Sequence, residues 1–550
     1  MATSIRLRRW QQRALRAFTD HPRPDFLAVA TPGAGKTTFA LTAATTALHE
    51  RRARGVVVVA PTQHLKAQWS AAAARFGLHL DPSWTPRDAS LPADLHGVVT
   101  TYAQVATAAE ELRTIADGAF VVLDEIHHAG DDRAWGTGVQ RAFGGAALRL
   151  SLSGTPFRSD TTPIPFVDYH LDEARADFDY GYGDALVDGS VVRPVFFPRV
   201  GGLMEWIDHG GDTVLASFDD ELDRQRANQR LRTALSLEGE WLPAVLEDAH
   251  RQLLDLRADH PSAGGLVIAI DQDHARGIAE VLRRRCGVRA TVAVSDDPDA
   301  SARISEFAVG SDPWIIAVRM VSEGVDIPRL RIGVFATNTT TELFFRQAVG
   351  RLVRWTDGVS GDQAAHLHLP DDPRLRRWAE GIGEVRRHSL SRRRERDDLD
   401  GELDDDRADA GDGSEEQLSL FAAVSAVAGD AEVVSSHAAV GVTVDHDWSA
   451  RGHDDDLLEI RLEPPPLPNG RQPDPIDPDT GVRLTRVQLR RRLRDRNASA
   501  VKELVRSTPL DHRQVNAELN RLAGVRGVTE ATVEELQRRL DHANRWLSKV

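Results

Sequence analysis

Cysteine is almost absent from this sequence of 550 residues, in which Cys286 stands alone. One thiol cannot build a disulfide framework or a zinc site that needs several cysteines. No apolar run approaches the roughly 18 consecutive residues that a membrane span requires, and the N-terminal stretch has no apolar signal core. We therefore expect a soluble, cytoplasmic protein that is not associated with a membrane.

Lysine is the second scarcity. Lys and Arg together number 68, yet lysine stands only at positions 36, 66, 502 and 549. Arginine is thus the ordinary base of this chain. A lysine is therefore informative wherever chemistry prefers a compact ammonium group.

The net charge of −15 is placed unevenly. Residues 397–416 contain 11 acidic residues and one basic residue, whereas residues 483–549 contain 16 basic and 8 acidic residues. Because binding depends on local potential, the overall acidity does not exclude a nucleic acid as partner.

Short apolar runs alternate with amphipathic stretches along most of the chain, and this pattern predicts a parallel α/β fold. The length allows two or three domains. The first series of expected strands is 26–30, 56–60, 98–101, 120–123 and 148–152. A Pro-rich and Gly-rich stretch follows, and a second series is expected at 265–270, 290–294, 314–318, 332–336 and 365–369. Two similar α/β domains in tandem are the simplest account.

The segment AVATPGAGKTTFAL follows an expected strand and opens an expected helix, which is the setting of a phosphate-binding loop. Glycines let backbone N–H groups approach phosphates, a lysine reaches the β- and γ-phosphates, and a hydroxyl can bind Mg²⁺. Ala30 stands where the pattern has its first glycine, a tolerable change where a strand is ending. The segment predicts an ATP site at Thr31, Pro32, Gly33, Ala34, Gly35, Lys36, Thr37 and Thr38.

The segment VVLDEIHHAG is an apolar run that ends in two acids. Asp124 is expected to hold Mg²⁺, together with Thr37, and Glu125 to polarise the attacking water. A strand with an acidic turn is the alternative for this segment alone. The lysine loop 88 residues earlier favours the catalytic interpretation.

The segment QAVGRLVR places Gln347, Arg351 and Arg354 at spacings i, i+4 and i+7. A helix would bring all three to one face. If that face lines a cleft between domains, the arginines can act as fingers on the γ-phosphate, with Gln347 beside them in the catalytic set. An Arg-rich solvated helix is the alternative.

With these residues, the chain resembles superfamily 2 helicases, in the branch of DEAH-type, excision-repair and type III restriction motors. The resemblance implies two tandem RecA-like domains that bind ATP and Mg²⁺. LRRWQQRAL is similar to the adenine-recognising motif, with Gln11 as the adenine contact, and APTQHLKAQW and VVTTYAQV are similar to the strand-contacting motifs Ia and Ib.

Three further likenesses follow in the family's order, and the last of them is QAVGRLVR, which resembles motif VI. LSLSGTPFRSD resembles motif III, which implies that Ser153 and Thr155 relay the nucleotide state. VSEGVDIP resembles motif V, which implies nucleotide contacts from Gly324 and Asp326. His127 would face QAVGRLVR across the cleft, although a lone histidine can equally be a satisfied polar residue.

The resemblance implies an ATP-dependent DNA helicase or translocase that serves DNA repair, replication or phage defence. SGTP and QxxGRxxR depart from the DEAD-box pattern, so the resemblance favours DNA over RNA. The expected partner is single-stranded or tailed duplex DNA, with RNA as the alternative. Two alternatives stay open. One is a duplex DNA translocase of a restriction or defence complex that separates no strands. The other is an ATP-dependent nucleic-acid binding switch.

The expected division of the chain follows from these motifs. It comprises RecA-like domain 1 at residues 1–195, a connector at 196–235, RecA-like domain 2 at 236–390, an acidic disordered linker at 391–416, a weakly patterned accessory segment at 417–480 and a basic, mainly helical C-terminal module at 481–550.

The end of the chain suggests partners. Gln417, Leu418, Leu420 and Phe421 resemble the bacterial sliding-clamp-binding motif, and a core strand or helix is the alternative. Residues 508–520 fit a helix-turn-helix, or otherwise a merely solvated helical face. The chain carries no nuclease signature, so a restriction role would need a nuclease partner.

Overall fold

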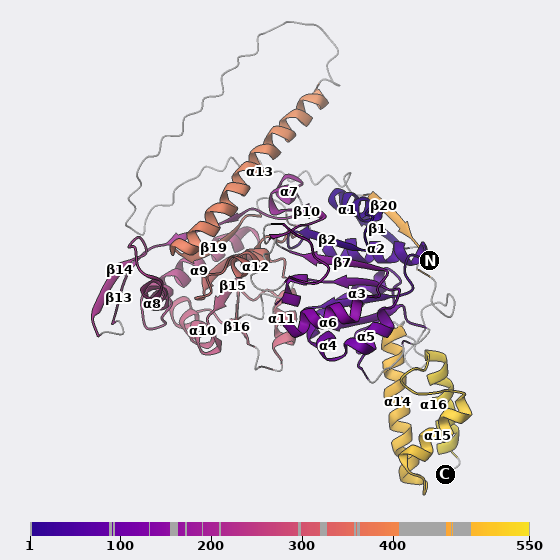
Figure 1. Ribbon diagram of the computed structural model, residues 1–550. Coiled ribbons are helices and arrows are strands. Elements are labelled where there is room, and N and C mark those ends of the chain that lie inside the picture. The colour runs from indigo at the N-terminus through magenta and orange to yellow at the C-terminus, as the bar shows by residue number, and fades with distance from the viewer. Residues whose placement is uncertain are drawn as a thin grey trace.

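The computed structural model describes residues 3–548 apart from several gaps. The gaps are residues 87–90, 92–93, 131–132, 155–162, 171–172, 190, 208–210, 295–296, 298, 319–326, 357–358, 360–362, 406–457, 464 and 466–485. Two seven-stranded sheets form the body, and a bundle of helices projects from it (Figure 1). We call residues 8–180 the first unit, residues 195–390 the second unit and residues 486–547 the C-terminal module.

The first sheet is entirely parallel, as the alternating pattern predicts. Its strands lie in the order β10 (Phe178–Tyr180), β2 (Asp25–Ala30), β7 (Leu148–Ser153), β6 (Phe120–Leu123), β3 (Val56–Ala60), β5 (Gly97–Thr101) and β4 (Leu80–Asp81). The five long strands match the five expected runs to within a residue. Parallel strands end at a common edge, so the loops after β2, β6 and β7 meet there.

Helices cover both faces of the first sheet. On one face α1 (Arg9–Thr19), α2 (Lys36–His49) and α3 (Gln63–Arg75) share a buried cluster with the strands. On the other face lie α4 (Tyr102–Thr107), α5 (Ala109–Ala116) and α6 (Arg133–Phe143). A short 3-10 helix, η1 (Ile126–Gly130), follows β6, and β8 (Tyr169–His170) pairs with β9 (Glu173–Ala174).

The second sheet is also parallel. Its strands lie in the order β11 (Val195–Phe196), β19 (Ala365–Pro370), β18 (Leu330–Ala336), β15 (Gly264–Ala269), β17 (Trp314–Ala317) and β16 (Ala290–Ala293), and β12 (Arg199–Val200) also pairs with β19. All five runs expected for the second domain are therefore strands. Two tandem parallel α/β units are confirmed.

The helices of the second unit also divide between its two faces. One cluster takes α8 (Arg224–Ala234), α9 (Trp241–Asp259) and α10 (Gln272–Cys286). The other takes α11 (Ala300–Val309), α12 (Glu342–Leu352) and the start of α13 (Pro373–Asp405), and it is continuous with the α1–α3 side of the first unit. One apolar core thus joins the units and brings α12 to the first sheet's edge.

The expected connector at residues 196–235 belongs to the second unit, so the predicted boundary is corrected. Strands β11 and β12 extend the second sheet, and a hairpin of β13 (Leu203–Ile207) and β14 (Thr213–Ser217) packs with α8 against it. Proline cannot donate to a strand ladder, so the prolines of PVFFP mark a turn in sequence reasoning. Here Pro194 and Pro198 border two-residue strands near the sheet edge, where proline is tolerated. The intervening helix α7 (Tyr182–Val187) packs against α13.

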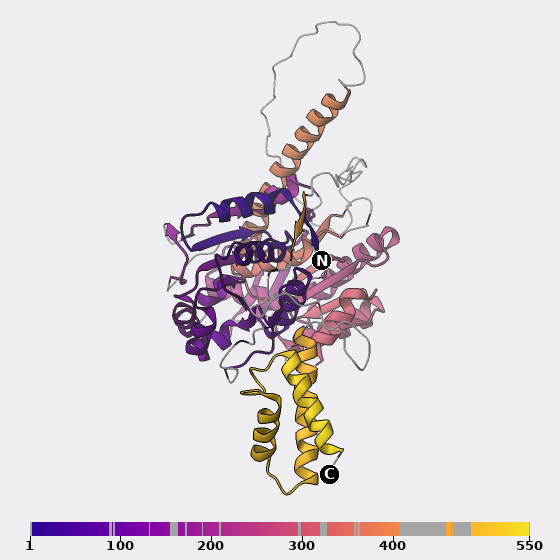
Figure 2. The same ribbon diagram turned by 90° about the vertical axis from the view of Figure 1, so that its right-hand side faces the viewer.

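Helix α13 runs on to Asp405 and so occupies the first part of the expected disordered linker at 391–416. It extends well past the body in two views (Figures 1 and 2). High charge and scarce aromatics do not distinguish a disordered chain from a solvated helix. Arg, Glu and Leu are all good helix formers, and they are frequent in this stretch. The rest of the expected linker, residues 406–416, lies outside the described residues.

The expected accessory segment at 417–480 contributes a strand. Strand β20 (Leu458–Leu462) pairs antiparallel with β1 (Thr3–Leu7), with Leu462 opposite Thr3. The alternation in LEIRL is a strand signal, but its partner stands over 450 residues away in the chain.

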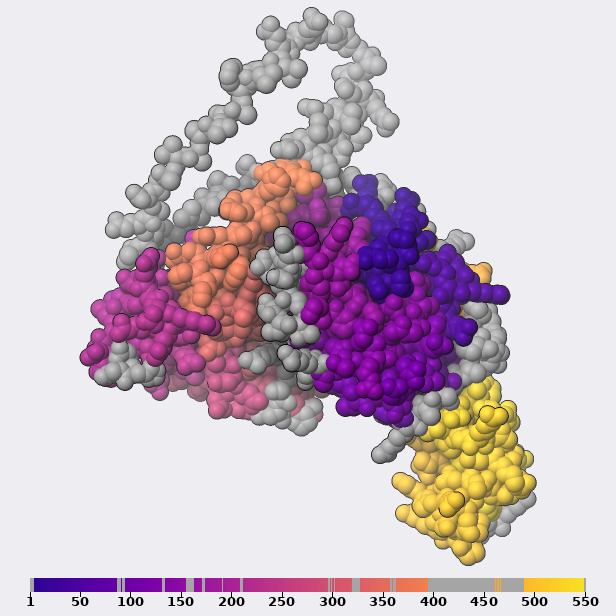
Figure 3. Space-filling model, in the orientation of Figure 1, coloured from indigo at the N-terminus to yellow at the C-terminus, as the bar shows by residue number. Residues whose placement is uncertain are grey.

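The C-terminal module is helical, as expected. It consists of α14 (Arg486–Ser507), α15 (His512–Ala523) and α16 (Val533–Leu547) around one apolar cluster. It projects beneath the first unit (Figure 3). A buried ion pair joins Arg490 to Asp81 of β4 at 3.4 Å, and the backbone N–H of Val533 donates to Asp94 at 3.2 Å. Among the helices within the described ranges, none has the length and apolar character that crossing a membrane would take.

Candidate nucleotide site

The phosphate loop joins β2 to α2, as the sequence predicts. Gly33 and Gly35 have φ values of +81° and +95°, a left-handed conformation that side chains rarely adopt. Lys36 then begins α2, with Thr37 and Thr38 in its first turn. Ala30 ends the strand in register with Tyr180, so the missing first glycine falls where the backbone is still extended. The loop therefore presents its amides at the start of a helix, a favourable place for phosphate.

Three residues at the start of α1 donate hydrogen bonds to the backbone of this loop. The Arg8 guanidinium and the Trp10 indole both donate to the carbonyl of Ala34, each at 3.0 Å. The Gln11 amide donates to the carbonyl of Gly35 at 2.9 Å, and its oxygen accepts from the Arg8 N–H. Gln11, the expected adenine contact, thus lies against the loop backbone. Sequence reasoning missed Arg8 and Trp10, which only their tertiary contacts reveal.

The two acids follow β6 at the same edge. The Lys36 ammonium lies 3.1 Å from Glu125 Oε1 and donates to the carbonyl of Ala30 at 3.2 Å. The backbone N–H of Gly154 donates to Glu125 Oε2 at 2.9 Å. Glu125 itself has a positive φ of 47°, a strained conformation for a side chain of this kind. Loop, strand end and motif III therefore converge on one carboxylate.

The two neighbouring carboxyls have opposite pKa shifts. Burial and the adjacent charge of Glu125 raise the pKa of Asp124 to about 6. For Glu125, burial opposes ionisation, but the charges of Lys36 and His127 and the Gly154 N–H outweigh it, and the pKa falls to about 2. Because burial disfavours the ionised form of Asp124, a nearby cation would stabilise that form. Asp124 and the Thr37 hydroxyl are also oxygen ligands of the kind that Mg²⁺ prefers, so these residues fit the ion.

Asp124 is held by two residues that the sequence assigned elsewhere. The Trp69 indole donates to Asp124 Oδ2 at 2.8 Å, and the Tyr102 hydroxyl donates to the Asp124 carbonyl at 2.9 Å. Both lie in the segments that resemble strand-contacting motifs. The sequence shows a tryptophan and a tyrosine in these segments but does not show that their side chains point to Asp124.

His127 lies where the two units meet. Its Nδ1 is 3.6 Å from Glu125 Oε2 and 3.5 Å from Ser153 Oγ, and its Nε2 is 3.5 Å from the Gln347 amide nitrogen. The imidazole is 7% exposed and Ser153 is fully buried. The structure thus brings together His127 and Ser153, two of the residues expected to couple the nucleotide to the second unit.

Helix α12 packs directly on the phosphate loop. A methyl group added at Gly350 would lie 2.7 Å from Cγ of Pro32, and one added at Gly33 would lie 3.4 Å from Cγ of Arg354. Arg351 is in the last turn of α12. The loop is therefore in contact with the arginine-bearing segment.

The expected single helical face holds for Gln347 and Arg351 and is corrected for Arg354. The helix ends at Leu352, because the next residues pair with an extended segment before β11: Arg193 N–H donates to the Val353 carbonyl at 2.7 Å, and Arg354 forms a bridge with Val192. Strand-like pairing of Arg354 cannot be read from a helical spacing.

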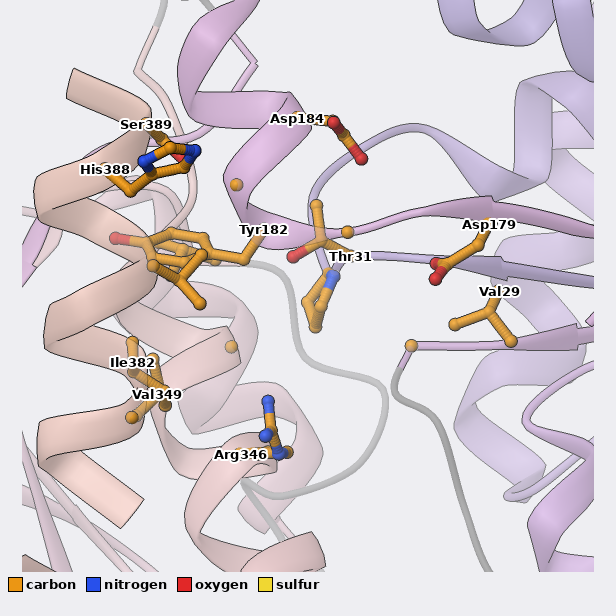
Figure 4. Close-up of a pocket in the computed structure, with 18 of the residues that line it drawn as sticks. Val29, Thr31, Asp179, Tyr182, Asp184, Arg346, Val349, Ile382, His388 and Ser389 are labelled. Carbon is orange, nitrogen blue, oxygen red and sulfur yellow. The ribbon is translucent and has the colours of Figure 1, made fainter. Parts of the chain in front are cut away.

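A cavity of about 390 Å³ lies beside this contact (Figure 4). Its wall combines Thr31 and Pro32 of the loop, Val349 of α12, Tyr182 of α7 and Ile382 of α13. Figure 4 shows side chains reaching it from both units and from α13. The junction between the two units is therefore incompletely filled beside the phosphate loop.

Several expected site residues lie outside the described residues. They are Thr155, Gly324, Asp326, Gln417, Leu418, Leu420 and Phe421. Their roles in coupling, nucleotide contact and clamp binding stay predictions.

The two parallel sheets, the lysine loop, the paired acids and the Gln-Arg segment, in this order and around one cleft, define a helicase-type protein of superfamily 2. Residues 4–158 match the family model described as the type III restriction enzyme, res subunit.

Curated relatives extend the likeness beyond the first unit. The chain is 48% identical over 406 residues to the uncharacterized protein Rv2917 of Mycobacterium tuberculosis, covering 72% of this chain and 67% of that protein. It is 45% identical over 393 residues to the uncharacterized protein ML1624 of Mycobacterium leprae, covering 70% and 65%. The chain belongs to the family of these mycobacterial proteins, and it spans about two thirds of their length.

Solved structures match part of the chain with TM-scores below 0.5. A fragment of a putative HsdR subunit of a type I restriction enzyme from Vibrio vulnificus matches with a TM-score of 0.48 and 16% identity, over 67% of this chain and 65% of that one. Dbp5 of S. cerevisiae bound to RNA and ADP BeF3 matches with a TM-score of 0.44 and 13% identity, over 69% and 87%.

Proposed function

We propose that this protein is an ATP-dependent DNA motor, a helicase or translocase that couples ATP hydrolysis to movement on DNA. One observation carries the proposal. Contacts of 2.9–3.6 Å run without interruption from Lys36 through Glu125, Gly154 and His127 to Gln347. A nucleotide at the lysine loop would therefore be sensed by both units.

The residues can divide the work of hydrolysis between them. The Lys36 ammonium and the loop amides bind the phosphates, and Asp124 with Thr37 holds Mg²⁺. Bound there, Mg²⁺ would neutralise charge on the phosphates. Arg351, in the last turn of α12, and Arg354, just beyond that helix, would stabilise charge on the terminal phosphate, and Gln347 would report its presence to His127.

Glu125 is the proposed base for the attacking water. In this structure the Lys36 ammonium holds it in an ion pair of 3.1 Å. That charge is also the largest influence that lowers the pKa of Glu125. When Lys36 turns to the phosphates of ATP, the carboxylate regains basicity and can accept a proton from water. Substrate binding thus activates the base.

The match of residues 4–158 to a restriction-enzyme subunit favours a second candidate, a duplex DNA translocase that separates no strands. A third candidate is an ATP-dependent binding switch. We place the motor in the cytoplasm, in DNA repair, replication or phage defence. Its proposed partners are the sliding clamp, through residues 417–421, and a nuclease.

One set of assays separates these candidates. ATP turnover by the full chain is measured with single-stranded DNA, duplex DNA, RNA and no nucleic acid, and strand displacement with tailed duplexes. A helicase is stimulated by the single strand and displaces strands, whereas a translocase is stimulated by the duplex and does not. Stimulation by RNA alone contradicts the DNA assignment. Absence of hydrolysis under every condition contradicts the motor.

A further inference from the structure

Trp69 connects the proposed Mg²⁺ site with a segment that resembles a strand-contacting motif. Its helix, α3, comes from the segment that resembles strand-contacting motif Ia. Its indole N–H, however, donates to Oδ2 of Asp124, the proposed Mg²⁺ ligand, at 2.8 Å. Trp69 is 3% exposed and Asp124 is 9% exposed. The tryptophan therefore reaches inward, to the metal side.

Tyr102 makes the matching contact from the second strand-contacting segment. Its hydroxyl donates to the backbone carbonyl of Asp124 at 2.9 Å, and its side chain is fully buried. Tyr102 begins helix α4, whose cap is the Thr101 hydroxyl accepting from Gln104 N–H at 3.3 Å. The side chain and the backbone of one acid are thus held by two different helices, each of which belongs to a segment that resembles a strand-contacting motif.

A buried lysine joins the two elements. Lys66 stands three residues before Trp69 on α3, so both lie on the same side of that helix. Its ammonium donates to the Gln104 side chain of α4 at 2.8 Å, and it is 4% exposed. Arginine is the usual base of this chain, so a compact ammonium at this position is notable. Helices α3 and α4 and the Asp124 carboxylate are therefore connected by hydrogen bonds throughout.

We propose that Trp69 and Tyr102 are positioning residues that align Asp124 for Mg²⁺ according to whether DNA occupies α3 and α4. The proposal rests on the proposed function, because it names the link between its two substrates. The indole holds Oδ2 and so fixes the orientation of the carboxylate that would bind the ion. Partners of this kind typically change metal affinity by about 10- to 100-fold.

The link also works in the other direction. A shift of α3 or α4 on binding DNA moves the donors of Asp124, and by thermodynamic reciprocity Mg²⁺ binding must favour the same arrangement of the helices. DNA should then lower the Mg²⁺ concentration that half-saturates nucleotide binding. This effect should need both donors.

The test measures binding rather than turnover. A fluorescent ADP analogue is titrated with Mg²⁺ against the full chain, with and without single-stranded DNA. Trp69→Phe keeps most of the buried ring but removes the donor, and Tyr102→Phe removes only a hydroxyl. We expect the half-saturating Mg²⁺ concentration to rise about 10-fold in Trp69→Phe. We also expect DNA to shift it in the wild type but in neither variant.

Trp314→Phe is the matched control. Trp314 is also fully buried, and its indole donates to His250 at 3.1 Å in the second unit, away from Asp124. It should behave like the wild type in the Mg²⁺ titration. Thermal unfolding of all variants identifies any that do not fold, and the conservative Tyr102→Phe keeps the test decisive if Trp69→Phe is lost.

The outcomes separate two failures. Wild-type Mg²⁺ dependence and a wild-type response to DNA in both Trp69→Phe and Tyr102→Phe would overturn the inference and leave the motor intact. A wild-type chain that binds no nucleotide with Mg²⁺ would instead overturn the proposed function, and the inference with it.

Discussion

The two units contribute to the cleft in different ways. In the first unit, Glu125 contacts Lys36 and accepts from the Gly154 N–H, and Asp124 accepts from Trp69, all at 3.1 Å or less. From the second unit, Gln347 reaches His127 only at 3.5 Å. The proposed binding groups are thus preorganised in the first unit, while the groups proposed to respond to the γ-phosphate lie on the second. The difference indicates where a motor can be switched without losing its substrate.

The comparison predicts its largest effect for Glu125→Gln. The amide keeps the size of the side chain but cannot take a proton from water, so turnover should fall by up to about 10⁴-fold. Nucleotide affinity should stay near that of the wild type, because Lys36 and Asp124 are unchanged. Turnover and equilibrium binding are measured on the same preparation. Turnover close to the wild-type value would remove Glu125 from its proposed role.

The second unit should give a different result. Arg351→Ala and Arg354→Ala should each lower DNA-stimulated turnover by about 10³-fold, because a finger stabilises charge that develops only in the transition state. Nucleotide and DNA binding should remain. The kinetic constants and both affinities are the measurement. A parallel loss of ATP affinity and turnover would show that the arginines bind the ground state, and the division of labour between the units would be wrong.

A smaller effect is expected where the C-terminal module meets the first unit. Arg490→Ala leaves Asp81 as a buried charge without its guanidinium, which should destabilise this junction by about 3 kcal/mol. Arg491→Ala removes an exposed arginine from the same helix and is the control. Hydrogen exchange in α14 and β4 reports the change. Equal exchange in the two variants would show that the ion pair does not hold the module.

The last effect concerns pH and two buried histidines, one near each sheet. Burial and the charge of His79 lower the pKa of His96 to about 4, and burial lowers that of His368 to about 4. As the pH falls, both histidines take up a proton in the unfolded chain before they do so in the folded protein. The free energy of unfolding should therefore decrease between about pH 6.5 and pH 4, and these two groups should not change it above that window. Each histidine contributes about 1.4 kcal/mol per pH unit.

Urea unfolding at pH 7 and pH 5 checks this pH dependence. His368→Gln should reduce the loss at pH 5, whereas His512→Gln, at an exposed position, should not. An unchanged pH dependence in His368→Gln would contradict the buried neutral histidine.

The sequence predicted the parts of the molecule that depend on local pattern. Ten apolar runs became ten parallel strands, because a strand covered on both faces must be apolar throughout. The two-residue strands β11 and β12 carried no such signal. The pairing of β1 with β20 joins segments too distant for any local pattern to connect.

The same division holds at the candidate site. Lys36, Asp124, Glu125 and Gln347 could be predicted, because phosphate and water chemistry demands particular residue types at particular spacings. Trp69 and Tyr102 could not, because the sequence places each in a segment that resembles a strand-contacting motif but does not reveal that both donate to Asp124. Helices α3 and α4 lie on opposite faces of the sheet, and their contacts with Asp124 depend on how each helix packs against the strands.

The most direct test of the central claim is ATP turnover by the wild-type chain and by Lys36→Ala, each with and without single-stranded DNA. Lysine is scarce in this chain, and the Lys36 ammonium lies 3.1 Å from the proposed base. We predict Mg²⁺-dependent turnover that rises with DNA in the wild type and is abolished in Lys36→Ala. Turnover that is equal in the two proteins, or that ignores DNA, would contradict the account.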